Sequence, residues 1–183
     1  MTSNYDVIVI GGGVVGCLTA RALSRYQLRI LLLEREADVC SGTSKANTAI
    51  IHAGYDARPG SLKAALNVAG NRMYSQVCGE LGVLFERNGT YVVALEDEDR
   101  HTLEELRERG IRNGVPGLSI ISAEQMRKAE PLLSEQTRGG LFAETGGIVD
   151  PFMMTIAAAE NAVENGVELG LDTEVTGLEL RQG

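Results

Sequence analysis

Apolar and polar positions follow a regular order at the start of the chain. Residues 6–10 are apolar after the first position, which is typical of a parallel strand buried on both faces. Apolar residues then recur at helical spacing between positions 14 and 22, and residues 30–34 form a second apolar run that ends in an acid. The pattern predicts a strand–helix–strand unit with parallel strands.

The same reading predicts the remaining elements. Helices are expected over residues 61–81, 96–113, 122–130 and 151–165. Strands are expected over residues 49–51, 119–121, 138–143, 167–172 and 174–180. Residues 85–88 and 90–94 flank Gly89 and predict a bent strand or a hairpin, whereas residues 37–47 have the small, polar composition of a loop.

This order of elements predicts the α/β class. A Rossmann-like βαβ domain comes first, and mixed strands and helices follow it before the pattern returns to a helix and strands. We therefore expect a dinucleotide-binding domain that begins in residues 1–82, an inserted α+β substrate-domain part in residues 83–147, and a return to the first domain in residues 148–183.

The turn after the first strand carries the spacing G-x-G-x-x-G. Gly11 permits the tight turn, Gly13 lets backbone approach a pyrophosphate, and Gly16 lets the helix lie close to the strand. The first-turn N–H groups around Val14 and Val15 have no intrahelical partners and form an anion site with the helix dipole. The alternative is a buried unit with a glycine-rich turn and no ligand.

An acid ends the second apolar run. Glu34 lies 23 residues after Gly11, close to the spacing of about 20 at which an acid accepts hydrogen bonds from ribose hydroxyls. Its charge would repel a 2′-phosphate, so NADP is disfavoured relative to NAD or FAD. Arg35 follows directly and is included among the nucleotide-binding candidates.

Composition narrows the class of protein. The 183 residues are 44% hydrophobic and 23% charged, as in an ordinary globular protein, and the net charge of −8 argues against nucleic-acid or basic membrane surfaces. Cys17, Cys40 and Cys78 are too widely spaced for a metal site or a disulfide framework, and they favour a cytoplasmic location. No apolar stretch is long enough to predict a transmembrane segment.

Several segments together resemble the FAD-dependent oxidoreductase family that includes D-amino acid oxidase. They are the opening βαβ unit, residues 43–47, residues 51–54, residues 59–64 and the Gly-Ile-Val-Asp-Pro sequence at 147–151. Within that family the chain is similar to FAD-linked glycerol-3-phosphate dehydrogenases and L-2-hydroxyglutarate oxidases. The resemblance implies FAD as cofactor and suggests that this chain is the N-terminal portion of such an enzyme.

The resemblance also implies roles for individual residues. The FAD pyrophosphate would be held by Gly11, Gly13 and Gly16, and the adenosine ribose by Glu34. The loop residues Thr43 and Ser44 would cover the phosphates and the ribityl chain, and Val175 would contact the adenine. The isoalloxazine ring would lie along His52, Ala53 and Gly54. His52 is the candidate base for a substrate hydroxyl. Its alternative is a buried histidine satisfied by local backbone.

The reaction implied is hydride transfer from a small hydroxylated anion of the glycerol-3-phosphate type to flavin N5. The sequence His52-Ala53-Gly54-Tyr55 favours instead a 2-hydroxy acid such as L-2-hydroxyglutarate. Arg58, Arg72 and Arg87 are either anion anchors or surface residues. The alternative interpretations of the chain are a non-catalytic nucleotide-binding fragment and an NAD-binding Rossmann dehydrogenase. A parallel sheet that ends in an unpaired edge also predicts self-association.

Overall fold

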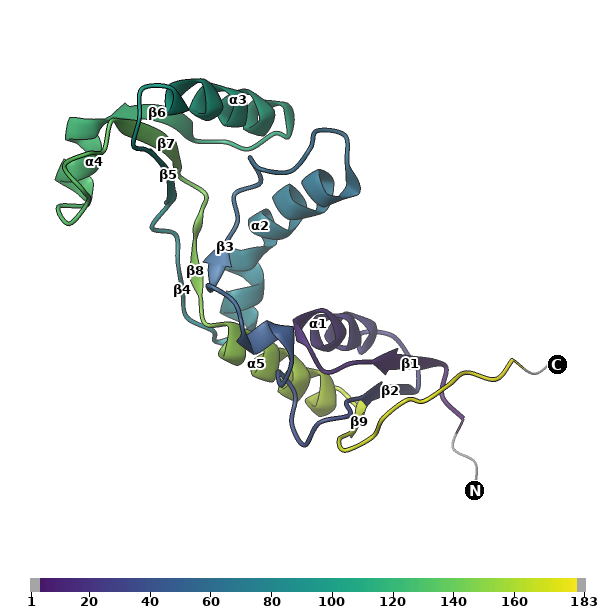
Figure 1. Ribbon diagram of the computed structural model, residues 1–183. Coiled ribbons are helices and arrows are strands. Elements are labelled where there is room, and N and C mark those ends of the chain that lie inside the picture. The colour runs from purple at the N-terminus through teal and green to yellow at the C-terminus, as the bar shows by residue number, and fades with distance from the viewer. Residues whose placement is uncertain (1–3, 181–183) are drawn as a thin grey trace. The chain divides into compact units, whose positions relative to one another are not determined.

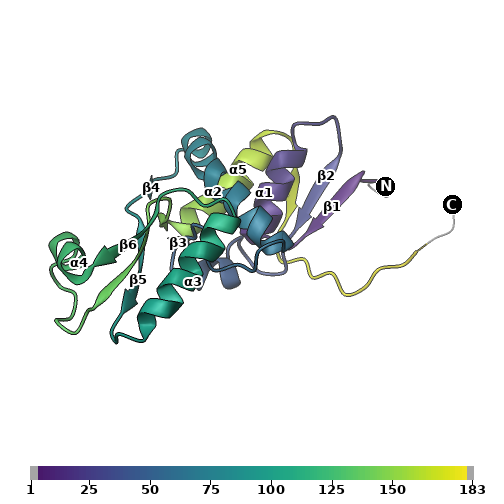
Figure 2. The same ribbon diagram turned by 90° about the horizontal axis from the view of Figure 1, so that it is seen from above.

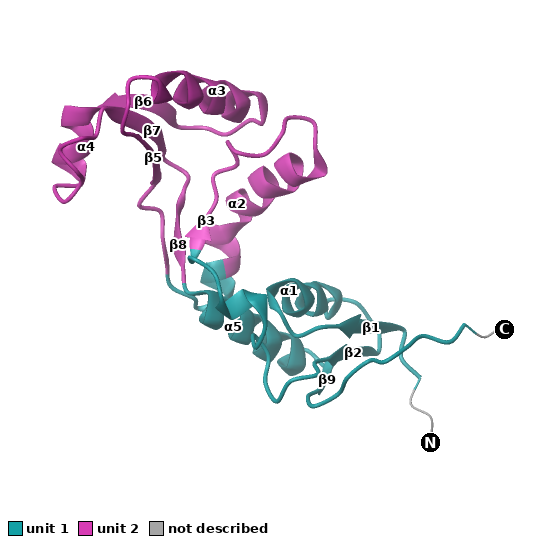
Figure 3. Ribbon diagram, viewed as in Figure 1, with its two compact units in different colours: residues 1–49, 78–84, 150–183 teal, residues 50–77, 85–149 magenta. Residues whose placement is uncertain are grey.

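The computed structural model describes residues 4–180 (Figure 1). The chain forms two compact units (Figure 3): unit 1 comprises residues 1–49, 78–84 and 150–183, and unit 2 comprises residues 50–77 and 85–149. The predicted boundaries group residues 50–77 with the nucleotide-binding part, whereas in the structure these residues cluster with the inserted segment.

Unit 1 is built on a three-stranded parallel sheet. Strands β1 (Val7–Ile10), β2 (Ile30–Leu33) and β9 (Glu168–Gly170) lie in the order β1-β2-β9. Helices α1 (Val14–Leu23) and α5 (Pro151–Glu164) lie side by side in both views (Figure 1, Figure 2). The predicted strand–helix–strand unit is confirmed.

The core of unit 1 lies between these helices and the sheet. Its helix residues are small and its strand residues are large and aliphatic, so the helices approach the strands closely. The buried members are Cys17, Ala20, Ile30, Leu32, Val39, Ala158, Ala159, Ala162 and Val167. Asp150 begins α5 by accepting hydrogen bonds from the N–H groups of Phe152 and Met153.

Unit 2 contains two antiparallel sheets. The first has the order β3 (Ile50–Ile51), β8 (Gly147–Val149), β4 (Phe85–Glu86). The second has the order β5 (Thr90–Ala94), β7 (Gly139–Ala143), β6 (Leu118–Ser122). Its helices are α2 (Leu62–Leu81, whose last turn belongs to unit 1), α3 (Asp99–Arg112) and α4 (Ala123–Ala129).

Two sequence expectations are settled by strand pairing. Residues 85–94 form two separate strands in different sheets and not a hairpin, because β4 pairs with β8 while β5 pairs with β7. The strand expected over residues 174–180 is wrong, since this segment follows β9 without regular structure. An extended segment becomes a strand only where a neighbouring backbone offers hydrogen bonds, and among the described residues none does so here.

The helices of the described residues include none that is both long and apolar enough to cross a membrane.

The short α4 begins at a reciprocal cap. The Ser122 hydroxyl accepts from the N–H of Gln125, and the Gln125 side chain accepts from the N–H of Ser122.

Candidate functional site: a nucleotide pocket in unit 1 and a histidine pocket in unit 2

The glycine turn between β1 and α1 has the geometry that its spacing predicts. Gly11 adopts φ +105°, a conformation that L side chains rarely reach. A Cβ at Gly16 would collide with the backbone oxygen of Gly11, so α1 can start this close to the strand only with glycine there. Gly13 is the N-cap of α1 and has no side-chain cap. Because the N–H of Val14 donates to the Ser44 hydroxyl, the first-turn N–H groups after Val14 are the ones left for an anion.

Glu34 is positioned at this turn by two backbone donors. Its carboxylate accepts from the N–H of Gly12 at 2.6 Å and from the N–H of Glu36 at 3.0 Å. These amide hydrogen bonds, that of Glu36 first, lower the pKa of Glu34 against the opposing effect of partial burial. The carboxylate is therefore ionised at neutral pH and can accept further hydrogen bonds from hydroxyl groups.

The loop after β2 returns to the same turn. Ser44, in the short 3-10 helix η1 (Thr43–Lys45), accepts from the N–H of Val14 through its hydroxyl at 2.9 Å. A Cβ at Gly13 would lie 3.1 Å from that hydroxyl, so glycine and serine fit together. Thr43 is exposed on η1. Val15 is 76% exposed on the first turn of α1.

The backbone carbonyl of Gly12, in the same turn, is fixed by two hydrogen bonds. It accepts from the N–H of Cys40 at 2.9 Å and from the thiol of Cys17 at 3.3 Å. Burial raises the pKa of Cys17 to about 11, with the nearby Cys40 and Glu34 adding to the effect. Cys17 is therefore a neutral structural thiol that supports the turn.

A pocket of about 350 Å³ lies beside the glycine turn and the carboxylate of Glu34. From the predicted set it is lined by Gly11, Gly13, Glu34, Arg35 and Val175, all within unit 1. Bare backbone amides beside an ionised carboxylate suit a phosphate and a ribose, so the residues present fit the ADP portion of a dinucleotide.

Other lining residues were not identified from the sequence: Ile10, Leu33, Glu36, Ser41, Gly42, Thr173 and Glu174. Thr173 reaches the pocket because its N–H donates to the carbonyl of Glu34 at 2.9 Å, which extends the contact between β2 and β9 past the strand end. The polar loop composition of residues 41–42 was the available signal for that side. None existed for residues 173–174, whose place depends on tertiary pairing.

His52 lies in unit 2 and is exposed, so the alternative of a buried histidine is wrong. Its backbone carbonyl accepts from the side-chain amides of Asn67 at 3.1 Å and Asn71 at 3.0 Å, both on α2. The main chain at His52 is thus fixed while the imidazole lines a pocket of about 220 Å³. Asp56 and Lys63 line the same pocket, 3.9 Å apart as an ion pair.

The two residues after His52 have packing roles of their own. Ala53 is buried in a cluster with Val68, Val115 and Ala143. Gly54 has φ +111°, and a Cβ there would lie 2.8 Å from Val68. Small residues at these positions are therefore required by the core of unit 2, whatever else they contact.

The three arginines that the sequence offers as anion anchors, Arg58, Arg72 and Arg87, have different surroundings in the structure. Arg87 donates to the side-chain oxygen and carbonyl of Asn71 and to the carbonyl of Thr145, so it is a structural residue. Arg72 donates to the carbonyl of Gly114 at 3.3 Å. Arg58 lines a different pocket, together with Arg109 and Arg112, which were not predicted from the sequence.

Comparison with known proteins matches residues 6–183 to the family described as FAD dependent oxidoreductase (DAO). A glycerol 3-phosphate dehydrogenase of Caloramator mitchellensis is 52% identical over 175 residues, which are 96% of this chain and 36% of that protein. The human mitochondrial L-2-hydroxyglutarate dehydrogenase is 36% identical over an alignment of 184 positions, which covers 98% of this chain and 39% of that protein.

A solved structure extends the likeness to three dimensions. The dithionite-reduced L-alpha-glycerophosphate oxidase of Mycoplasma pneumoniae, with FAD bound, superposes with a TM-score of 0.91 at 34% identity. The match covers 96% of this chain and 46% of that one. The chain thus spans less than half the length of these relatives.

Proposed function

The chain belongs to the family of FAD dependent oxidoreductases, and on that premise we propose that unit 1 binds the ADP portion of FAD within an enzyme that oxidises a small hydroxylated anion of the glycerol 3-phosphate type. The relative at 52% identity is a glycerol 3-phosphate dehydrogenase, which supports this substrate class.

One observation carries the cofactor part of the proposal: the ionised Glu34 lies in the same pocket as the glycine turn, held by the N–H of Gly12. The carboxylate would accept hydrogen bonds from both ribose hydroxyls, and the first-turn amides of α1 would donate to the pyrophosphate. Ser44 would keep the covering loop against the turn through its bond to Val14.

When bound, the flavin would supply the acceptor for the hydride that leaves the substrate carbon. We propose His52 as the base that takes the proton of the substrate hydroxyl. Its carbonyl is fixed by Asn67 and Asn71, while its imidazole lines a pocket and is exposed to exchange protons.

A second substrate class has its own support. The human relative is an L-2-hydroxyglutarate dehydrogenase. Oxidation of a 2-hydroxy acid would use the same base and the same hydride acceptor, and it would differ only in the anionic group that must be recognised. The competing substrates are therefore a phosphate monoester and a dicarboxylate.

Cofactor binding is tested by incubating the protein with FAD, removing free flavin by gel filtration and recording the visible spectrum. We expect retained flavin absorbance. Anaerobic addition of glycerol 3-phosphate or L-2-hydroxyglutarate should then bleach that absorbance, and the faster of the two identifies the substrate. A protein that stays colourless at every FAD concentration would instead be a non-catalytic module.

The role of His52 is tested in the same assay. His52→Gln should retain FAD and slow bleaching by about 10²–10⁴-fold, the range for loss of a general base. His101→Gln is the matched control, because His101 is exposed on α3 and its imidazole lies 3.2 Å from the carboxylate of Glu105. Equal rates for the two variants would remove His52 from the mechanism.

A further inference from the structure

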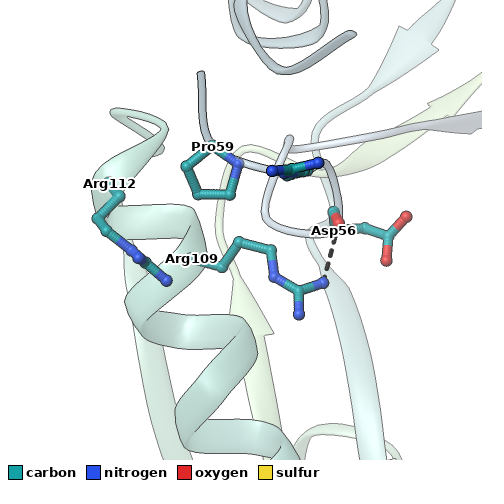
Figure 4. Close-up of a pocket in the computed structure, with 5 residues that line it drawn as sticks. Asp56, Pro59, Arg109 and Arg112 are labelled. Carbon is teal, nitrogen blue, oxygen red and sulfur yellow. Dashed lines mark hydrogen bonds between the residues drawn. The ribbon is translucent and has the colours of Figure 1, made fainter. Parts of the chain in front are cut away.

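Three arginines meet at a pocket of unit 2 that the proposed function does not use. Arg109 and Arg112 come from the last turn of α3, and Arg58 comes from the loop before α2. With Asp56 and Pro59 they line a pocket of about 540 Å³ (Figure 4). That volume falls in the range of about 300–1,000 Å³ for small-molecule sites.

The charge of this pocket is not neutralised from within. Arginine stays protonated in proteins, and among the described residues no carboxylate lies within 4.0 Å of these three guanidinium groups. The one acid of the lining, Asp56, has its carboxylate 3.9 Å from Lys63 and points away from Arg109 and Arg112 (Figure 4).

Helix capping does not account for the two arginines of α3. Basic residues in a last turn commonly neutralise free carbonyl groups. Here the carbonyls of Arg109, Gly110 and Ile111 already accept from the N–H groups of Asn113, Val115 and Gly114. The guanidinium of Arg112 makes no hydrogen bond within the described residues and is free for a ligand.

The backbone that carries the arginines is fixed. The Asn113 side chain donates to the carbonyls of Gly54 and Ala57, at 2.9 and 2.7 Å, and Arg109 donates to the carbonyl of Asp56 at 3.1 Å. Gly110 has no room for a Cβ between Tyr55 and Leu118. The loop and the end of α3 therefore form one rigid support, which lowers the cost of ordering a bound anion.

We propose that Arg58, Arg109 and Arg112 form a binding site for the phosphate group of a phosphate monoester. Guanidinium groups bind phosphate oxygens in pairs of parallel hydrogen bonds. Such a phosphate carries about −1.5 to −2 charge at neutral pH. Three arginines without a carboxylate partner are neutralised better by that charge than by the single charge of one carboxylate.

The test is a titration of the FAD-saturated protein with inorganic phosphate and with glycerol 3-phosphate, followed calorimetrically, with glycerol as the uncharged control. Arg112→Gln and Arg58→Gln should each raise the dissociation constant about tenfold or more, the effect of losing a charge-assisted hydrogen bond. Arg107→Gln removes the same charge from α3 outside the pocket and should leave binding within about twofold.

Each result decides a point. Equal affinity for the two phosphates indicates a site for the phosphate alone, whereas tighter glycerol 3-phosphate binding shows that the organic part is also held. Unchanged affinity in both pocket variants, or no binding at millimolar phosphate, overturns the proposal. FAD retention is read in the same samples and reports on the nucleotide pocket of unit 1, so failure of cofactor binding is distinguishable from failure of phosphate binding.

Discussion

The carboxylate of Glu34 accepts a hydrogen bond from the backbone N–H of Gly12 across 2.6 Å. This contact joins the end of β2 to the glycine turn that follows β1. The same carboxylate lines the nucleotide pocket. One side chain therefore sets the shape of the turn and presents the negative charge that a ribose would contact.

Glu34→Gln should weaken FAD binding about 10–100-fold, because charge-assisted hydrogen bonds become neutral ones and the amide brings a donor toward the N–H of Gly12. Discrimination against NADP should shrink in the same variant. Flavin fluorescence titration measures the FAD affinity, and competition by NADP in the same titration measures the discrimination. Glu105→Gln, an exposed change on α3, serves as control; equal FAD affinity in the two variants would contradict the assigned role.

The pH dependence of FAD affinity follows from the same residue. The pKa of Glu34 is lowered in the folded state, so its ionised form is fully present above the ordinary carboxyl value of about 4.3 and is lost as pH falls through the lower folded value. Affinity should stay flat from neutral pH down to the ordinary value and then decline. Glu34→Gln should abolish this decline, and its persistence would point to another group.

Gly16→Ala should destabilise unit 1 by about 3 kcal/mol, because the new methyl group meets the backbone of Gly11 and not a flexible side chain. Gly79→Ala is the matched control, since it lies on a helix with nothing within 4 Å of the added Cβ. That change should stabilise by about 0.5–1 kcal/mol. Urea unfolding midpoints compare the two, and similar midpoints would contradict the packing argument.

Asn71→Ala should destabilise unit 2 by about 3 kcal/mol. Asn71 is 5% exposed, and its loss removes three side-chain hydrogen bonds, which join it to the carbonyls of His52 and Thr145 and to the guanidinium of Arg87. Asn67→Ala, at a half-buried position with a single side-chain bond to His52, should cost only about 1 kcal/mol. Thermal unfolding measures the difference, which vanishes if the network is unimportant.

Self-association is expected through β1. Among residues 4–180 this strand pairs with β2 on one side only, and Ile8 and Ile10 on it are 51% and 56% exposed. Ile8→Lys should therefore shift the protein toward monomer in sedimentation velocity. Val15→Lys adds the same charge at an exposed helix position and should not; an identical shift in both variants would indicate a general charge effect.

The opening βαβ unit could be predicted because its signals are local. Strand runs, glycine spacing and the terminal acid each depend on a few neighbouring residues, and the structure shows the resulting turn with Gly11 at positive φ. Helix ends were equally accessible: Ser122 and Asp150 both act as caps.

Features that depend on distant pairing were not accessible from the sequence. Residues 174–180 alternate like a strand, yet no described strand lies beside them. Arg58 and Arg112 are 54 positions apart in the sequence, and the bonds from Arg109 and Asn113 to the loop bring their surroundings together. The local pattern around either arginine is that of an ordinary surface residue.

Asn113 also makes this part of the molecule sensitive to chemical ageing. Hydrolysis of its amide would replace the donor that holds two carbonyls by an oxygen that repels them, and its present side-chain oxygen is already buried without a partner among the described residues. The new negative charge would arise within the rigid support of the three arginines. Protein hydrolysed at Asn113, recognised by a gain of one mass unit, would therefore have both a loosened loop and a weakened affinity for anions.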